Sequence, residues 1–233
     1  MSSVRDISLY VHIPFCVRKC PYCDFNSYQY DLISREFQEQ AYTNALCKEL
    51  QHRAQLHDLS QVRLRSIFFG GGTPSLFSAK SISRIISTAK EVFAFSEDLE
   101  VTLEANPSTL AEELASQKLK DYQICGVNRL SFGVQSFSDR KLSLLGRIHT
   151  SADSRQAVLL ASNAGFTNIS IDLMFGVKDE SLQEWQNDLE MAAQLPISHI
   201  SCYCLTIESG TEYGARQRKG EVLTVTDNNY SIL

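Results

Sequence analysis

Short β-branched and aromatic runs recur six times along the chain, and segments with helical periodicity lie between them. Each run has the length of a single strand and is bounded by turn residues. The six predicted strands are ISLYVHI (7–13), SIFFG (66–70), LEVTLEA (99–105), RLSFGV (129–134), NISIDLM (168–174) and ISCYCLT (200–206). Strands that alternate with helices form parallel units, so the pattern predicts either an α/β barrel or a doubly wound sheet.

The intervening segments carry helix signals. In residues 78–93 the apolar side chains return to one face every three or four residues. Thr109 with Glu112, and Ser181 with Glu184, have the spacing of capping boxes that open the third and the last helices. These signals agree with a helix after each strand.

Polar residues lie near the carboxyl ends of the predicted strands or directly after them. They are the cysteine-rich segment 16–23, GGGTP (70–74), Glu104, Gln135, Asp172, Thr206 and Glu208. In a barrel the carboxyl ends of all strands converge on one mouth, whereas an open sheet offers a single crevice. Six contributing strands favour a curled sheet but are too few to close the usual eight-stranded barrel. The predicted fold is therefore an open partial (β/α)6 barrel of the TIM-like kind.

Composition limits the class of protein. The 233 residues are 43% hydrophobic and 21% charged, with a net charge of −5. Such a chain buries a substantial core, and its acidic balance argues against nonspecific nucleic-acid binding. No apolar stretch approaches the ~20 residues that span a membrane. The first residues lack the layout of a signal peptide, so we expect a cytoplasmic protein with reduced thiols.

Three of the seven cysteines form the motif C-x3-C-x2-C at Cys16, Cys20 and Cys23. The last two alone would suit a glutaredoxin-like dithiol, and zinc would need a fourth ligand, for which His12 is nearest. Three thiolates on one short loop instead suit a cubane iron–sulfur cluster with its fourth iron open to an exchangeable ligand. We expect His12 to be a strand histidine with a hydrogen-bond partner, and the other cysteines to be small buried side chains.

The cysteine motif and four later motifs resemble one known family. C-x3-C-x2-C with an aromatic residue before the third cysteine is similar to the radical S-adenosylmethionine (SAM) superfamily. GGGTP, LEANP, RLSFGVQSF and SIDLMFG resemble the branch that includes oxygen-independent coproporphyrinogen III oxidase. The resemblance implies a 4Fe-4S cluster whose open iron binds SAM, which is cleaved to a 5′-deoxyadenosyl radical. It also implies that residues 1–233 are a radical SAM core domain and that the family's C-terminal domain is missing.

The resemblance implies roles for individual residues. The cluster ligands would be Cys16, Cys20 and Cys23. The first SAM would be contacted by Tyr10, Tyr22, Gly71 and Glu104. A second SAM would be contacted by Gly72, Thr73, Gln135, Arg147 and Asp172. Without the resemblance, the glycine loop would be an ordinary strand-to-helix turn and Glu104 an exposed strand-end carboxylate. Arg147 would then be a solvated helix residue, and Asp172 a loop cap.

One departure separates members of the branch. The oxidases resemble C-x3-C-x2-C-x-C, but the fourth cysteine position here is Phe25. CPYCDFNSY (20–28) instead resembles the HemW family of haem chaperones, which bind haem and pass it to acceptor proteins. The resemblance favours a chaperone over an enzyme, with cluster, SAM and haem as cofactors and a haem-acceptor protein, soluble or at a membrane, as partner. The alternatives are a coproporphyrinogen III oxidase of porphyrin biosynthesis and a glutaredoxin-like thiol oxidoreductase.

These chaperones resemble one another in a His-Asn-x-x-Tyr-Trp segment after the barrel that serves haem binding. None of the five histidines here lies in such a segment. We expect His52 and His57 on a polar helix, and His149 and His199 in solvated or capping positions. The chain is therefore expected to hold the cluster and SAM modules but only part of a haem site.

Overall fold

The computed structural model describes residues 4–31, 33–59, 61–110 and 115–225. Its main sheet has six parallel strands in the order β1-β4-β5-β6-β7-β8. These strands are β1 (Arg5–Ile13), β4 (Val62–Gly71), β5 (Ala94–Ala105), β6 (Arg129–Gln135), β7 (Asn168–Phe175) and β8 (His199–Cys204). A short parallel pair is formed by β2 (Phe15–Cys16) and β3 (Tyr28–Gln29).

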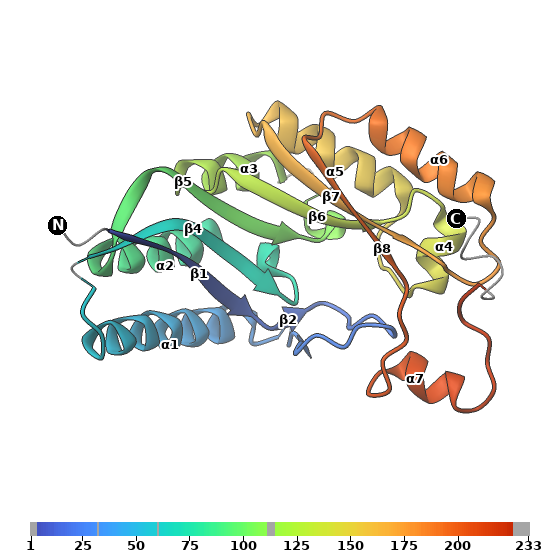
Figure 1. Ribbon diagram of the computed structural model, residues 1–233, viewed down its shortest axis with the longest axis horizontal. Helices are drawn as coiled ribbons and strands as arrows, with labels where there is room; N and C mark the ends of the chain where they lie inside the picture. The colour runs from blue at the N-terminus through green and yellow to red at the C-terminus, as the bar shows by residue number, and fades with distance from the viewer. Residues whose placement is uncertain (1–3, 32, 60, 111–114, 226–233) are drawn as a thin grey trace.

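The helices of the described residues alternate with the strands. They are α1 (Arg35–Gln55), α2 (Ala79–Val92), α3 (Ala115–Ile124), α4 (Asp139–Leu144), α5 (Ser151–Asn163), α6 (Leu182–Ala193) and α7 (Glu212–Gln217), with 3-10 turns η1 (Pro74–Leu76) and η2 (Pro107–Thr109). The sheet curls, with the long helices along its outer face and β1 and β8 at opposite edges (Figure 1). The predicted open partial (β/α)6 barrel is confirmed.

Alternation along the strands sorts side chains between the two faces of the sheet. Leu103 of β5 pairs in register with Leu130 of β6, and both are fully buried in the core beneath the helices. The next pair in register is Glu104 and Ser131, and both line a cavity on the concave face. The apolar alternate positions thus build the core, and the polar ones are presented to the open side.

The predicted helix boundaries can be compared with the observed ones. α2 begins after the N-cap Ser78, whose side chain accepts a hydrogen bond from Ser81 N, and it buries the predicted isoleucine face. The capping box at Ser181 is confirmed, because its side chain and that of the third helical residue both bond the backbone. Glu112 lies outside the described residues, so the box that starts at Thr109 stays a prediction.

The cysteines outside the motif are only partly as predicted. Cys47 lies on α1 and is buried in the core, as expected, whereas Cys125 and Cys204 are only half-buried. Cys202 is exposed, so the prediction of a buried thiol is wrong there. The reason is its position on β8, an edge strand that has a neighbour on one side only.

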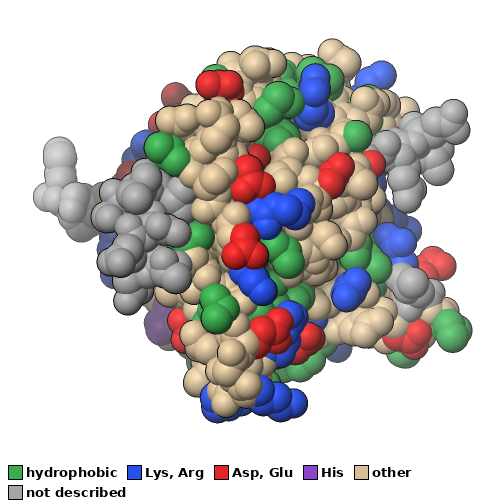
Figure 2. Space-filling model, turned by 90° about the vertical axis from the view of Figure 1, so that its right-hand side faces the viewer, with side chains coloured by type: hydrophobic (Ala, Val, Ile, Leu, Met, Phe, Trp, Pro, Cys, Tyr) green, Lys and Arg blue, Asp and Glu red, His purple; other side chains and the backbone are tan. Residues whose placement is uncertain are grey.

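The surface carries charges of both signs. On the face shown in Figure 2, Lys and Arg side chains are interspersed with Asp and Glu side chains. Within the described part of the chain, no helix combines the length and apolar character needed to cross a bilayer.

Candidate functional site

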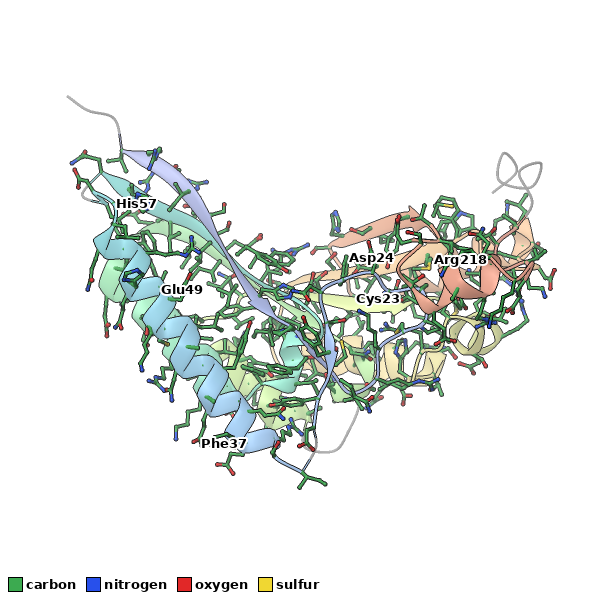
Figure 3. The ribbon with its side chains drawn as sticks, turned by 90° about the horizontal axis from the view of Figure 1, so that it is seen from below. Cys23, Asp24, Phe37, Glu49, His57 and Arg218 are labelled. Atoms are coloured by element: carbon green, nitrogen blue, oxygen red, sulfur yellow. The ribbon has the colours of Figure 1, made fainter. Side chains whose placement is uncertain are left out.

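The cysteine loop follows β1 and is held in place by backbone contacts. Gly72 N donates to the Ile13 carbonyl oxygen at 2.8 Å, and Thr73 N donates to the Phe15 carbonyl oxygen at 2.7 Å. On the other side, Tyr213 N of α7 donates to the Pro21 carbonyl oxygen at 2.9 Å. The glycine loop and α7 therefore hold the two ends of the cysteine segment. Figure 3 shows Cys23 and Asp24 on the side of the sheet where Arg218 follows α7.

A cavity of about 520 Å³ opens between this loop and the carboxyl ends of the strands. Eleven of the twelve predicted site residues line it: Cys16, Cys20, Tyr22, Cys23, Gly71, Gly72, Thr73, Glu104, Gln135, Arg147 and Asp172. Residues as far apart in the sequence as Cys16 and Asp172 are brought together, since the parallel strands all end at the same rim. Their assignment to particular ligands stays a prediction.

Tyr10 is the predicted site residue that is absent from the cavity lining. Its ring is 57% exposed on the edge strand β1 and stacks on Phe68, with centroids 6.1 Å apart. Its hydroxyl donates to His12 Nδ1 at 3.0 Å, because His12 Nε2 donates to the Asn26 carbonyl oxygen at 2.8 Å. The expected hydrogen-bonded strand histidine is confirmed, and both its nitrogens are engaged by the protein.

The three motif cysteines are half-buried. Burial raises the pKa of the Cys16 and Cys23 thiols. Two polar side chains reach sulfurs: Thr73 Oγ1 donates to Cys16 Sγ at 3.6 Å, and Arg147 Nη1 donates to Cys20 Sγ at 3.3 Å. No three of the described His, Cys, Asp and Glu side chains surround a single point as one metal ion would require.

The glycine loop packs against the protein itself. A Cβ added to Gly71 would lie 2.7 Å from His12 Cε1, and one added to Gly72 would lie 2.7 Å from the Phe15 carbonyl oxygen. Gly71 also has a φ of 121°, which L residues rarely adopt. The resemblance implies that SAM passes close to this loop, which stays a prediction. The structure gives a reason of its own for the glycines, because His12 and Phe15 fill the space that a side chain would need.

Two carboxyl groups lie in the cavity. Glu104 Oε2 accepts a hydrogen bond from Gly71 N at 3.1 Å. Burial, with a smaller contribution from the charge of Asp172, raises the pKa of Glu104 to about 7. Burial also raises the pKa of Asp172 to about 6, against the opposing effect of Arg129. Both side chains therefore lose negative charge more readily than an exposed carboxylate.

Gln135 and Tyr203 form the far wall. Gln135 has a φ of 70°, an unusual conformation for a residue with a side chain, and its Oε1 accepts a hydrogen bond from the Tyr203 hydroxyl. Burial raises the pKa of Tyr203. The sequence analysis missed Tyr203, although alternation along β8 puts it on the same face as Ser201, another cavity residue.

Comparison with known proteins places this cavity in a family. The model of the radical SAM superfamily matches residues 10–192. The chain belongs to the radical SAM superfamily. The matched range contains the whole cysteine loop, the last four residues of β1, all of β4, β5, β6 and β7, and nearly all of α6.

Several characterised proteins resemble this radical SAM chain. It is 44% identical to the haem chaperone HemW of Haemophilus influenzae, over 94% of this chain and 56% of that protein. It is 41% identical to HemW of Escherichia coli, over 93% of this chain and 55% of that protein. The solved structure of coproporphyrinogen III oxidase (HemN) from E. coli is 29% identical with a TM-score of 0.78, over 97% of this chain and 48% of that one. The chain spans about half the length of the curated relatives it matches.

The radical SAM family implies a 4Fe-4S cluster and SAM, and the cavity fits both. Cys16, Cys20 and Cys23 would provide three thiolate donors for the cluster at one rim. Arg147 Nε is shielded from solvent and has no hydrogen-bond partner among the described residues. A buried N–H donor without a partner, beside an open cavity, is expected where a bound ligand supplies the hydrogen-bond acceptor.

His149 differs from its prediction as a solvated or capping residue. It is 2% exposed, with Nε2 3.0 Å from the Val134 carbonyl oxygen and Nδ1 3.2 Å from Asn106 Oδ1. Burial, together with the charge of Arg147, lowers the pKa of His149 to about 4. The neutral imidazole is therefore a structural link between β6 and the loop after β5, which local sequence could not reveal.

Proposed function

We propose that this chain is the cluster- and SAM-binding core of a haem chaperone. The identity to proteins named haem chaperone HemW carries the proposal. It reaches 44% for H. influenzae, 41% for E. coli and 38% for Bacillus subtilis, against 29% for the coproporphyrinogen oxidase of the same fold. Binding haem and delivering it to an acceptor protein are proposed for the protein that contains this core.

Phe25 supports the proposal from within the site. It stands where the oxidase pattern has a fourth cysteine, and its side chain is 62% exposed at the rim of the cavity. An exposed aromatic ring offers an apolar face to a flat macrocycle, whereas it can supply neither a metal ligand nor a thiol.

The chain's own residues would prepare the site as follows. Cys16, Cys20 and Cys23 would hold the cluster, and Gly71 N would orient Glu104 toward the methionine end of SAM. When bound, the cluster and SAM supply the one-electron chemistry of the family. Because the pKa of Glu104 is about 7, this carboxyl group can take up or release a proton near neutral pH as a charged ligand enters. Gln135, Arg147, Asp172, Gly72 and Thr73 stay candidates for a second SAM.

The test is a haem titration, followed by absorbance, on the reconstituted chain and on a longer chain that continues through the C-terminal region of its HemW relatives. We expect measurable haem binding by the longer chain and weaker binding by this core. Matched affinities would place the haem site within the barrel. If neither chain binds haem, the proposal fails.

The oxidase is the second candidate, because the chain shares its fold with a TM-score of 0.78. Anaerobic incubation of the longer chain with coproporphyrinogen III, SAM and a reductant distinguishes the two functions. We expect no decarboxylated product. Formation of protoporphyrinogen IX would replace the chaperone proposal with the oxidase.

A further inference from the structure

Arg147 occupies an unusual place for an arginine. It follows the turn after α4, where Gly146 has a φ of 67° and sits against Pro21 of the cysteine loop. Its side chain enters the cavity rather than solvent. No described carboxylate forms a salt bridge with it. A guanidinium stays charged in a protein, and this charge acts on the cavity carboxyl of Asp172, whose pKa it lowers against the larger effect of burial.

Two contacts fix the guanidinium plane. Arg147 Nη2 donates to the Gly133 carbonyl oxygen at 2.8 Å, and Nη1 donates to Cys20 Sγ at 3.3 Å. A Cβ at Gly133 would make only an ordinary contact with Nη2, at 3.4 Å, and a tighter one with Gln135 Nε2, at 3.0 Å. The Gly133 carbonyl oxygen therefore holds one terminal nitrogen of the guanidinium, Nη2, and the other, Nη1, faces Cys20 Sγ.

A charged donor at this sulfur has a definite physical effect. Hydrogen bonds to the sulfurs and the local net charge both set the reduction potential of an iron–sulfur cluster. Reduction adds one negative charge to the cluster, so a nearby cation stabilises the reduced form more than the oxidised form. Hydrogen bonds that involve ionised groups are roughly twice as strong as neutral ones. The Thr73 hydroxyl at Cys16 Sγ is neutral and longer, at 3.6 Å, and should act more weakly.

We propose that Arg147 raises the reduction potential of the cluster by donating a charged hydrogen bond to the Cys20 thiolate. It is a positioning and tuning residue, since it acts through a ligand. This role depends on the cluster site but not on haem binding. It also leaves Arg147 Nε as the part of the side chain with no protein partner among the described residues.

The experiment is a redox titration of the anaerobically reconstituted protein, followed by electron paramagnetic resonance after iron is counted. In Arg147→Gln we expect full iron content and an equilibrium constant for one-electron reduction that is roughly tenfold lower. This corresponds to a reduction potential about 59 mV more negative. Arg147→Lys keeps the positive charge but lacks the planar guanidinium that contacts Gly133 and Cys20 together. Its change in reduction potential should therefore be smaller than that of Arg147→Gln. Arg155→Gln removes the same charge from the exposed face of α5 and should match the wild type.

An unshifted potential in Arg147→Gln with full iron would overturn the proposal. If Arg147→Gln holds less iron, Arg147→Lys decides: a more negative potential supports the proposal, and a wild-type potential overturns it. If the wild-type protein itself binds no iron, the cluster site and the proposed function fail together. Haem binding without a potential shift would remove only the role of Arg147.

Discussion

The two sides of the cavity are built in different ways. The cysteine side, made of the cysteine loop and the glycine loop 70–74, is held by backbone hydrogen bonds and by an aromatic cluster. In that cluster Phe15 packs against Tyr30 and Tyr42, with ring centroids 4.9 Å and 5.2 Å away. The Gly72 and Thr73 amides complete this side. Among the described contacts, it needs no ion pair to keep its shape.

The C-terminal side, made of β6, β7 and α4, is held by buried charges. Lys141 is fully buried and forms ion pairs with Glu180 and Asp188. Asp188 Oδ2 accepts from Ser136 Oγ at 2.7 Å, and Glu180 Oε2 accepts from Gly176 N at 2.6 Å. The network thus ties together the loops that follow β6 and β7. The cysteine side is therefore stabilised by packing and backbone hydrogen bonds, and the C-terminal side by buried ion pairs.

The largest expected effect breaks the charge network. Lys141→Met would leave Glu180 and Asp188 buried without their cation, which should destabilise the chain by about 3–5 kcal/mol. The sequence neighbour Arg140 gives a matched control, because it pairs with Glu184 near the surface at 2.8 Å. Arg140→Met should lose only about 0–1 kcal/mol. Urea denaturation of both variants measures the difference, and equal losses would show that the buried network does not stabilise this side.

A second prediction concerns Glu104, which joins the two sides. Its carboxyl has a pKa of about 7 in the folded chain, against 4.5 as the reference. Between these values the folded chain binds an extra proton, so stability should fall as pH rises from about 4.5 to about 7, by up to about 3 kcal/mol. Glu104→Gln should flatten this part of the stability profile of the unloaded chain.

The carboxyl of Asp172, whose pKa is raised to about 6, also makes the stability fall with rising pH, over a lower pH range than Glu104. A residual slope is therefore expected in Glu104→Gln. Glu97→Gln, an exposed position on the same strand, is the control and should keep the wild-type profile. An identical profile for the Glu104 and Glu97 variants would contradict the burial of Glu104.

A third prediction concerns packing on the cysteine side. Gly72→Ala would push a methyl group to 2.7 Å from the Phe15 carbonyl oxygen, and backbone cannot move as a flexible side chain does. We expect a loss of about 1–3 kcal/mol and reduced iron loading. Gly210→Ala meets no atom within 4 Å and should change neither. Thermal unfolding and iron counting test both variants, and wild-type behaviour of Gly72→Ala would show that the two loops do not pack together.

The cysteine side was largely predictable, because its signals are local. Periodicity placed β1 and β4, and motif spacing brought the cysteines and the glycine loop to one rim. The motifs did not show why the chain needs glycine at positions 71 and 72. That reason lies in His12 and Phe15, which are separated from Gly71 and Gly72 by more than 50 residues.

The C-terminal side was less predictable, because its contacts join distant segments. The strands β6, β7 and β8 were placed correctly, but nothing in the local pattern shows that Lys141 is buried. A lysine in a short helix usually faces solvent, and only the approach of Glu180 and Asp188 reverses that expectation. The burial of His149 escaped notice for the same reason.

The central claim is that Cys16, Cys20 and Cys23 together hold a four-iron cluster at the rim of this cavity. Anaerobic reconstitution with iron and sulfide, followed by iron counting and absorption spectra, tests it on single alanine variants. The account predicts about four irons per wild-type chain, loss of the cluster from each of the three variants, and an intact cluster in Cys47→Ala, whose thiol is buried in the core on the inner face of α1. A full cluster in Cys16→Ala, or its loss from Cys47→Ala, would contradict the account.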